Sequence, residues 1–308
     1  MASVVSMALL LCGAAWTPAA AQVTLLEPTE NERPSLPEEF LTLVGRFSAV
    51  RYTPGSLDRA HHVLGRLETV ASRLNRWSDV PVAKAVYLLD RKQWAEAELP
   101  GIYGVPLPLG PTAIAVPALG DPETVALWRR VLGVDVLPMI PGIPLRGTPE
   151  EAATLAIADL LLQIESGRAL VERSGLRPER AWIAELAAHT AALSLVAALE
   201  AQRLPEIEAM LARIAQRLGG AGAYSLDEFS PLLLLGDEGA IKRWLWAQGA
   251  FSEGAAIIVA QDGKRAVPRM LKLAQAKDAR GLSLAALLER YPELEAWRAR
   301  YWPGSSSR

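Results

Sequence analysis

The chain has 308 residues, of which 51% are hydrophobic, so it can bury a large core and has the composition of a globular protein. Its 32 lysines and arginines nearly balance its 34 acidic residues, and no basic cluster stands out. Binding to nucleic acid needs a basic patch on the protein surface. We therefore expect no nucleic acid among the partners.

The N-terminal stretch MASVVSMALLLCGAAWTPAAAQ carries the features of an export signal. It is apolar from Val4 to Gly13 and ends in small residues, with Ala19 and Ala21 in the A-x-A positions before Gln22. We expect residues 1–21 to be a signal peptide and the mature protein to be periplasmic or secreted. The alternative is a start codon assigned upstream of a buried helix, because no Lys or Arg precedes the apolar run.

Cys12 is the only cysteine and lies inside this stretch. The mature chain would then have no disulfide, no thiolate nucleophile and no zinc site built from cysteine. A lipoprotein signal is disfavoured, because Leu11 before the cysteine is not small. No later segment reaches the roughly 20 uninterrupted apolar residues that a membrane span needs, so we expect no transmembrane span in the mature chain.

The first part of the mature chain alternates strand and helix patterns. After an acidic linker over 27–39, the run FLTLVGRFSAVRY predicts a strand that ends at Pro54 and Gly55, and Ser56 caps a helix. That helix, over 56–77, places seven apolar residues on one face: Ala60, Val63, Leu64, Leu67, Val70, Ala71 and Leu74. Three further elements follow, a strand over 82–90, a short helix over 91–99 and a strand over 112–119, with a loop rich in Gly and Pro at 101–111.

From Asp121 onward, helix patterns dominate. We expect helices over 122–132, 149–174, 178–203 and 205–218, and three more up to Trp302. Pro122, Pro149, Pro178 and Pro205 stand at or just inside the helix starts, where a missing N–H costs nothing. The fold class is therefore α+β, with a small N-terminal sheet and its helices followed by a predominantly helical half. We divide the mature chain into 22–120, 121–302 and a disordered tail at 303–308.

The stretch AWIAELAAH places a carboxylate and an imidazole one helical turn apart in an otherwise apolar segment. Glu185 and His189 fall on the apolar stripe formed by Trp182, Leu186, Leu193 and Val196. A buried carboxylate must be neutralised, paired or bound to a metal. We expect Glu185 to accept a hydrogen bond from His189, as an i, i+4 pair.

The order of elements, together with the W-x-x-E of Trp182 and Glu185, resembles the gluzincin zinc metallopeptidases. In that family a buried helix carries H-E-x-x-H, whose two histidines bind zinc while the glutamate activates water, and a glutamate on the next helix is the third ligand. Here Pro178, Trp182, Glu185 and Ala187 match the pattern around the third ligand loosely, although Leu186 replaces its usual glycine. The resemblance covers about 47–302 and implies a metallopeptidase-like fold.

The zinc-binding motif of that family is missing. The expected place reads TLAIADLLLQIESG, and the only histidines of the chain are His61, His62 and His189. Two registers are open: either Ala158, Asp159 and Leu162 replace His, Glu and His, or Asp159, Leu160 and Gln163 do. Zinc sites in proteins use His or Cys ligands, so both registers predict a lost zinc site and no cofactor.

The resemblance without its motif implies a non-catalytic peptidase-like protein. It would bind a peptide or protein partner in the former cleft, between an edge strand at Thr112–Leu119 and the buried helix, by strand addition. One alternative is a hydrolase with a non-standard site built from Asp159, Glu185 and His189, or a hard-cation site that adds Gln163. Another is a structural envelope protein that docks a partner on its helical half.

Other polar and aromatic residues give weaker indications. We expect one of His61 and His62 to face solvent and the other to face its neighbours, because adjacent helix positions point about 100° apart. Trp244 and Trp246 are expected in the core. No G-x-S-x-G motif is present, and GGAGAY at 219–224 lacks the lysine of a phosphate loop, so it is expected to end a helix.

Overall fold

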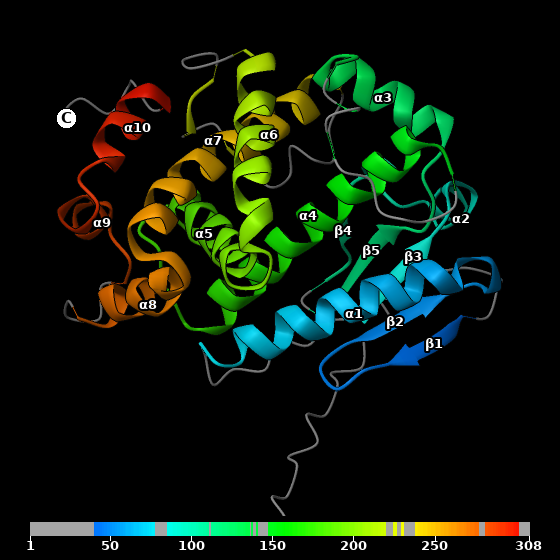
Figure 1. Ribbon diagram of the computed structural model, residues 1–308, viewed down its shortest axis with the longest axis horizontal. Helices are drawn as coiled ribbons and strands as arrows, with labels where there is room; N and C mark the ends of the chain where they lie inside the picture. Colours follow the sequence, from blue (N-terminus) through cyan, green and yellow to red (C-terminus); the bar gives the residue numbers. More distant parts are fainter. Residues whose placement is uncertain are drawn as a thin grey trace, which may run out of the picture.

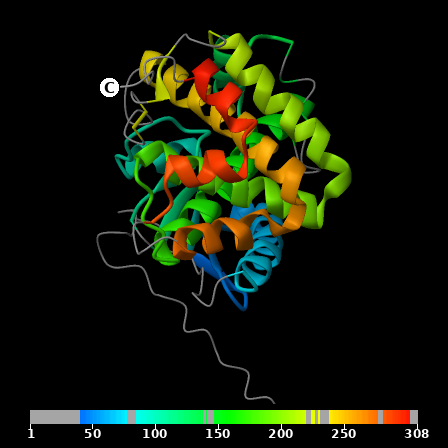
Figure 2. The ribbon, with the colours of Figure 1, turned by 90° about the vertical axis from the view of Figure 1, so that its left-hand side faces the viewer.

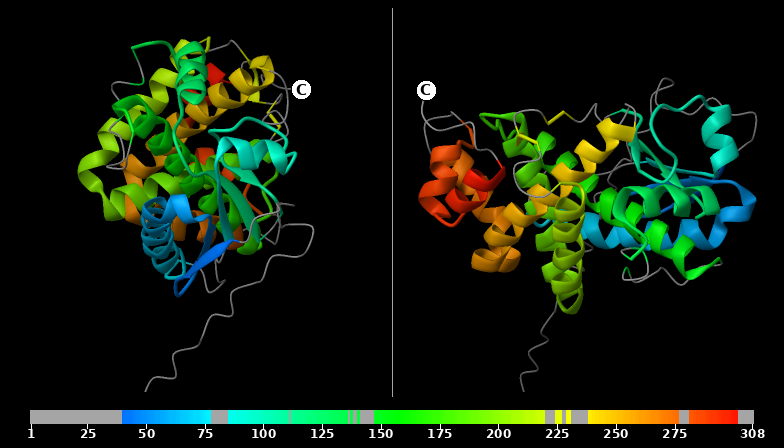
Figure 3. Two further views of the ribbon diagram at one scale, coloured as in Figure 1. Left: turned by 90° about the vertical axis from the view of Figure 1, so that its right-hand side faces the viewer. Right: turned by 90° about the horizontal axis from the view of Figure 1, so that it is seen from above.

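The computed structural model describes residues 40–77, 85–110, 112–135, 137, 140, 147–219, 224–226, 229–230, 238–276 and 281–301 (Figure 1). The expected signal peptide, the acidic linker and the C-terminal tail lie outside these residues. The described chain has an N-terminal mixed sheet with helices, followed by a largely helical half. Seen from above, the sheet and α10 lie at opposite ends of the molecule (Figure 3). The α+β class is therefore confirmed.

The sheet has five strands in the order β1-β2-β3-β5-β4. They are β1 (Leu41–Val44), β2 (Ala49–Tyr52), β3 (Ala85–Leu89), β4 (Leu107–Pro108) and β5 (Ala113–Pro117). The strands β2, β3 and β5 run parallel, while β1 and β4 are antiparallel to their neighbours. Every residue of β3 and β5 is buried, as expected for central parallel strands whose two faces are both covered.

Two expectations about the strands are wrong. The run from Phe40 to Tyr52 is not one strand but an antiparallel hairpin, which turns where the Gly45 N–H bonds to the Ser48 carbonyl. The strand β5 is not an edge strand, because β4 pairs along its outer side, with Leu107 opposite Ala115 and Pro108 opposite Ile114. The edge that was expected to receive a peptide is therefore occupied by the chain itself.

Helix α1 (Leu57–Leu74) packs on one face of the sheet, as its apolar stripe predicts. Six of the seven stripe residues are buried, and Leu64 is half-buried. Its residues Ala60, Val63 and Leu67 form one cluster with alternate residues of β2, β3 and β5, and Leu162 of helix α4 joins them. Ser56 stands at the N-cap, but its side chain makes no capping bond.

Helix α4 (Pro149–Arg173) connects the sheet to the helical half. It begins with a capping box, in which Thr148 accepts from the Glu151 N–H and the Glu151 side chain accepts from the Thr148 N–H. Helix α5 (Ala181–Leu199) lies against α4 (Figure 1). A Cβ added at Gly167 would meet the Ala188 carbonyl oxygen far inside van der Waals contact, so the two backbones cross here at close range.

The other helices complete the described chain: α2 (Arg91–Glu96), α3 (Pro122–Leu132), α6 (Leu204–Arg217), α7 (Glu238–Asp262), α8 (Ala266–Ala276), α9 (Leu284–Arg290) and α10 (Leu294–Tyr301). Four helices rather than three therefore follow α6. Pro122, Pro149 and Pro205 stand in the first turns of α3, α4 and α6 as expected. Pro178 does not, because α5 begins at Ala181 with Arg180 as its N-cap.

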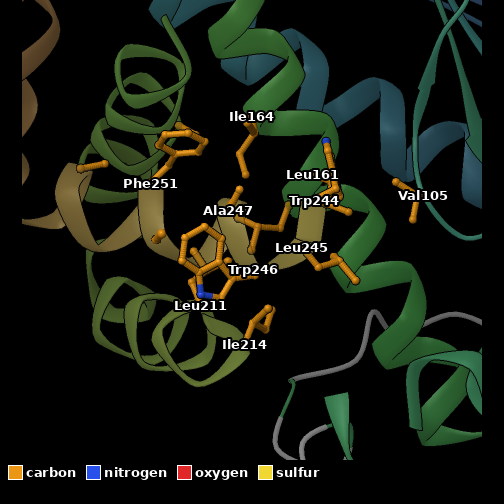
Figure 4. Close-up of a cluster of buried hydrophobic side chains, with 14 of the residues drawn as sticks. Val105, Leu161, Ile164, Leu211, Ile214, Trp244, Leu245, Trp246, Ala247 and Phe251 are labelled. Atoms are coloured by element: carbon orange, nitrogen blue, oxygen red, sulfur yellow. The ribbon is translucent and has the colours of Figure 1, made fainter. Parts of the chain in front are cut away.

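The largest core cluster joins both halves of the chain. It contains Tyr87 and Ala115 of the sheet, and also Trp182 of α5 and Phe251 of α7, so it crosses the proposed boundary at residue 120. Trp244 and Trp246 of α7 are buried in it beside Leu161 and Ile164 of α4 and Leu211 of α6 (Figure 4). The expectation that these two tryptophans serve packing is confirmed.

Helix α5 is long and apolar enough to cross a membrane by length and composition alone, and no other helix of the described residues is. It is mostly buried inside the protein, as the core helix of a folded domain is. Its residues are buried all around and not along one stripe.

Alanine substitutions at two helical glycines test how closely α4 and α5 pack. Gly167 lies at their crossing, and Gly65 of α1 is the control. Alanine at Gly65 of α1 meets nothing within 4 Å, so Gly65→Ala should raise the free energy of unfolding by about 0.5–1 kcal/mol through helix propensity. Gly167→Ala gains the same helix propensity, but its Cβ overpacks the crossing of α4 and α5. It should lower the free energy of unfolding by about 1–3 kcal/mol. Urea unfolding measures both. An unchanged Gly167→Ala would mean that the helices can separate without cost.

Candidate functional site

Asp159 of α4 lies in a buried ion pair with helix α1. Its carboxylate accepts two hydrogen bonds from the Arg59 guanidinium, with Nη1–Oδ2 at 3.0 Å and Nη2–Oδ1 at 2.5 Å. The His62 Nε2 lies 3.0 Å from Oδ2. Arg59 is 2% and Asp159 5% exposed, so this pair is removed from water. Burial by itself raises the pKa of Asp159, but Arg59 and His62 outweigh it and hold that pKa at about 2.

A second contact between α1 and α4 lies one turn further along α4 and two turns further along α1 from the Arg59–Asp159 pair. Arg66 Nη2 donates to Gln163 Oε1 at 3.1 Å, and Gln163 Nε2 donates to the Ala192 carbonyl of α5 at 3.0 Å. Asp159 and Gln163 therefore share one face of α4, as the i, i+4 spacing predicts, and that face lies against α1. The cavity between α1 and α4 beside them measures about 10 Å³, which is no more than one water molecule occupies.

Glu185 of α5 is buried and paired, as expected, but its partner is not His189. The Arg168 guanidinium donates to both carboxylate oxygens of Glu185, with Nε–Oε1 at 2.9 Å and Nη2–Oε2 at 2.6 Å. The same guanidinium forms an ion pair with Glu165, one turn earlier on α4. The expected pair failed because an arginine offers a charged two-point hydrogen bond, which is stronger than one from a neutral imidazole.

Arg168 thus bridges two buried carboxylates. Burial by itself lowers the pKa of Arg168, but the charges of Glu165 and Glu185 outweigh it and raise that pKa. Glu165 is 5% and Glu185 3% exposed, so two negative charges depend on one positive charge for compensation.

His189 takes partners from a third helix. Its Nδ1 lies 2.8 Å from the Ser252 Oγ and its Nε2 lies 3.0 Å from the Gln248 Oε1, both on α7. Burial, with the nearby charge of Arg168, lowers the pKa of His189 to about 3. The imidazole is therefore neutral near pH 7 and joins α5 to α7.

The three candidate residues do not form one site. Asp159 and Arg168 are nine positions apart on α4, a net rotation of about half a turn, so they face opposite sides of the helix. Asp159 contacts α1, Glu185 contacts Arg168, and His189 contacts α7. In the part of the chain that the structure describes, no group of three or more His, Cys, Asp or Glu side chains is placed to hold a metal.

The structure does not decide between the two registers of the missing motif. Ala158 and Leu162 are both buried, and Leu162 packs in the cluster between the sheet and α1. Asp159 and Gln163 pair with α1 as described above. The hydrogen bonds of these two residues do not reach Glu185.

His62 and Arg168 contribute to these contacts, although the sequence analysis did not place either of them in the candidate site. One of His61 and His62 was expected to face solvent and the other its neighbours, and this is confirmed: His61 is exposed and His62 lies at Asp159. The available signal was the spacing of Arg59, His62 and Arg66, which share one face of α1 and match the i, i+4 spacing of Asp159 and Gln163. No comparable spacing in the sequence indicated that Arg168 would pair with Glu185.

Comparisons of the chain with protein-family models, with curated proteins and with solved structures gave no match.

The pKa of Asp159 predicts how stability depends on pH. A depressed pKa contributes stability that is present above the unfolded pKa near 3.9 and is lost as the pH falls toward 2. Asp159→Asn should therefore lower the free energy of unfolding by about 2–3 kcal/mol at pH 7, and the difference from the wild type should shrink between pH 4 and pH 2. Urea unfolding across this range measures it, with Asp58→Asn on the exposed side of α1 as control. A difference that does not depend on pH would exclude the ion pair as its source.

The bridge made by Arg168 predicts an order of stabilities. Glu185→Ala should cost about 3–5 kcal/mol, because it leaves the buried guanidinium with one carboxylate. Arg168→Met should cost more, because it leaves Glu165 and Glu185 as two uncompensated buried charges. Thermal and urea unfolding give both values, and the exposed Glu172→Ala of α4 serves as control. Equal losses for the two variants would contradict the bridge.

Proposed function

We propose that the chain is an exported, non-catalytic protein of gluzincin type that binds a peptide or protein partner. The observation that carries this proposal is the engagement of the candidate catalytic groups. Asp159, Glu185 and His189 are each buried and hydrogen-bonded to a different helix or side chain. A catalytic acid or base must reach a substrate atom, and the space beside Asp159 holds no more than a water molecule.

The relation to gluzincins is supported by the arrangement of elements. A helix on the sheet (α1), the strands β3 and β5, a buried helix (α4) and a following helix with Trp182 and Glu185 occur in the order that the resemblance implies. Glu185 is buried and faces a positive charge, as the third zinc ligand of the family does, but the charge belongs to Arg168. This arrangement favours a protein that kept the frame of a peptidase and lost its metal.

Binding would take place beside the former site and not on β5, whose outer side is covered by β4. An open groove of about 340 Å³ lies between α1 and the C-terminal part of α5. His62 and Gln163 line this groove, and both also take part in the hydrogen bonds between α1 and α4. His61 and Arg66 bring N–H donors to the groove, Glu200 lies there as the ion-pair partner of Arg66 at 3.5 Å, and Leu195 and Leu199 bring apolar surface.

This composition fits a peptide with an acidic residue next to an apolar one. Carboxylates and carbonyl oxygens accept from imidazole and guanidinium N–H groups, while Leu199, which is 38% exposed, offers a hydrophobic contact. The active hydrolase built from Asp159, Glu185 and His189 has less support, because these residues do not converge on one space. The structural envelope role is favoured by no contact of the described residues.

The proposal predicts a protein without stoichiometric metal and without peptidase activity. Elemental analysis of the purified mature protein, and incubation with unfolded casein with and without added zinc, should give neither bound metal nor cleavage. A stoichiometric metal ion or turnover that Glu185→Ala abolishes would favour the hydrolase.

The binding half of the proposal is tested at Gly65, which lines the groove and has open space above its Cα. A displayed library of random twelve-residue peptides is selected on the wild-type protein, and the enriched peptides are synthesised and titrated by fluorescence polarisation. We expect acidic peptides whose affinity falls at least tenfold in Gly65→Trp, which fills the groove, and is unchanged in Gly65→Ala. Equal affinity for both variants would place binding elsewhere.

A further inference from the structure

A second groove lies in the helical half, between α6 and α10 and above α7. Figure 2 shows α7 between these two helices, as does Figure 1. The groove has a volume of about 510 Å³ and is open to solvent. It is separate from the groove between α1 and α5, because the two share no lining residue.

Small and apolar side chains form the floor and the lower walls of this groove. Ala209 and Ala212 come from α6, Ala256 and Ile257 from α7, and Ala296 and Trp297 from α10. Alanines keep side chains out of the groove, so the backbone of another helix can approach α6 and α7 at the 8–10 Å that helix packing requires. The channel between two helices is the shape that a third helix fills by its apolar face.

The rim of the groove is acidic on balance, with three glutamates and one arginine. Glu208 stands on the α6 side, Glu293 just before α10, Glu253 on α7, and Arg300 on α10. Glu253 is paired with Arg300 at 3.1 Å and accepts a bond from the Tyr301 hydroxyl at 2.6 Å. Glu208 and Glu293 have no hydrogen-bond or ion-pair partner among the described residues, so opposite walls each carry an unpaired carboxylate.

Glu208 is the more unusual of the two carboxylates. It is half-buried against the groove, and this burial raises its pKa. A desolvated carboxylate without a partner is unfavourable. A cation that enters the groove would therefore gain more at Glu208 than at a fully exposed glutamate.

Two terminal stretches of the chain do not suit this groove. The part between Gln22 and Glu39 carries five glutamates and one arginine and would be repelled by the rim. The stretch after Tyr301 is WPGSSSR, whose Pro and Gly oppose a helix. The unpaired carboxylates on the two walls favour an occupant with positive charge on both sides of an apolar face.

We propose that the groove between α6, α7 and α10 docks a basic amphipathic helix of a partner protein. Its apolar face packs on the alanines and Trp297, and lysines or arginines on its two flanks pair with Glu208 and Glu293. This surface is independent of the groove between α1 and α5, so the proposal stands whether or not that groove binds a peptide.

The test uses two synthetic helical peptides of fourteen residues on the full mature chain. Both have alanine and leucine at i, i+3, i+4 and i+7, and the flanks carry lysine in one peptide and glutamate in the other. Fluorescence polarisation should show binding of the lysine peptide only, with an affinity that falls as salt is raised. Glu208→Gln with Glu293→Gln should weaken binding about tenfold.

The matched control is Glu172→Gln with Glu206→Gln, which removes the same charge from exposed positions outside the groove and should leave the affinity unchanged. Ala209→Trp, which fills the groove from the exposed side of α6, should abolish binding while circular dichroism shows an unchanged fold. The proposal is overturned if both peptides bind equally, or if the two double variants have the same affinity. It is also overturned if sedimentation velocity shows a wild-type dimer that Ala209→Trp dissociates, because a second copy of the chain would then fill the groove.

Discussion

The close packing of α4 on α5 is the contact on which the other polar contacts of the core depend. At Gly167 the backbone of α4 lies against the Ala188 carbonyl, and no side chain separates them. At this distance the Gln163 amide reaches the Ala192 carbonyl, and Arg168 reaches both oxygens of Glu185. Since α4 also holds Asp159 against α1, it ties the sheet layer to the helical layer through hydrogen bonds as well as apolar contact.

Buried ion pairs of this kind are an expensive way to hold helices together. Well-packed apolar residues of similar size are often as stabilising or more so, because the charges lose their hydration. What charged pairs add is register: Arg59 and Asp159 are satisfied in one relative position of α1 and α4 only. The guanidinium of Arg168 holds Glu185 in the same way, through two fixed N–H bonds.

The fold was predictable from the sequence where local patterns decide it. The apolar spacing of α1, Pro149 at the start of α4, and the apolar runs of β3 and β5 each gave the right element within a few residues. The hairpin β1–β2 and the short strand β4 were missed, because pairing depends on residues distant along the chain and two residues give no periodicity. For the same reason β5 was placed at the edge of the sheet.

The candidate site was predictable only in part. Burial of Glu185 and His189 followed from the apolar residues around them, and so did the need of the carboxylate for a partner. The identity of that partner did not follow, since i, i+4 spacing favours a local pair and gives no sign of Arg168, which lies 17 positions away. The link between His62 and Asp159 spans 97 positions and follows from the packing of α1 on α4, which sequence periodicity leaves undetermined.

The chemistry of the two grooves limits what a partner can be. Volumes of about 340 and 510 Å³ fall in the range of ligand pockets, but both grooves are open, and a small molecule in either would keep much of its surface in water. Side chains of a larger partner suit such shallow sites, because the rest of the partner covers the rim and excludes water from the charged contacts. The groove between α1 and α5 offers the N–H donors of His61 and Arg66, with Glu200 paired to Arg66, while the groove above α7 offers the unpaired carboxylates of Glu208 and Glu293. The two grooves therefore differ in charge, and under the two proposals they would bind different segments.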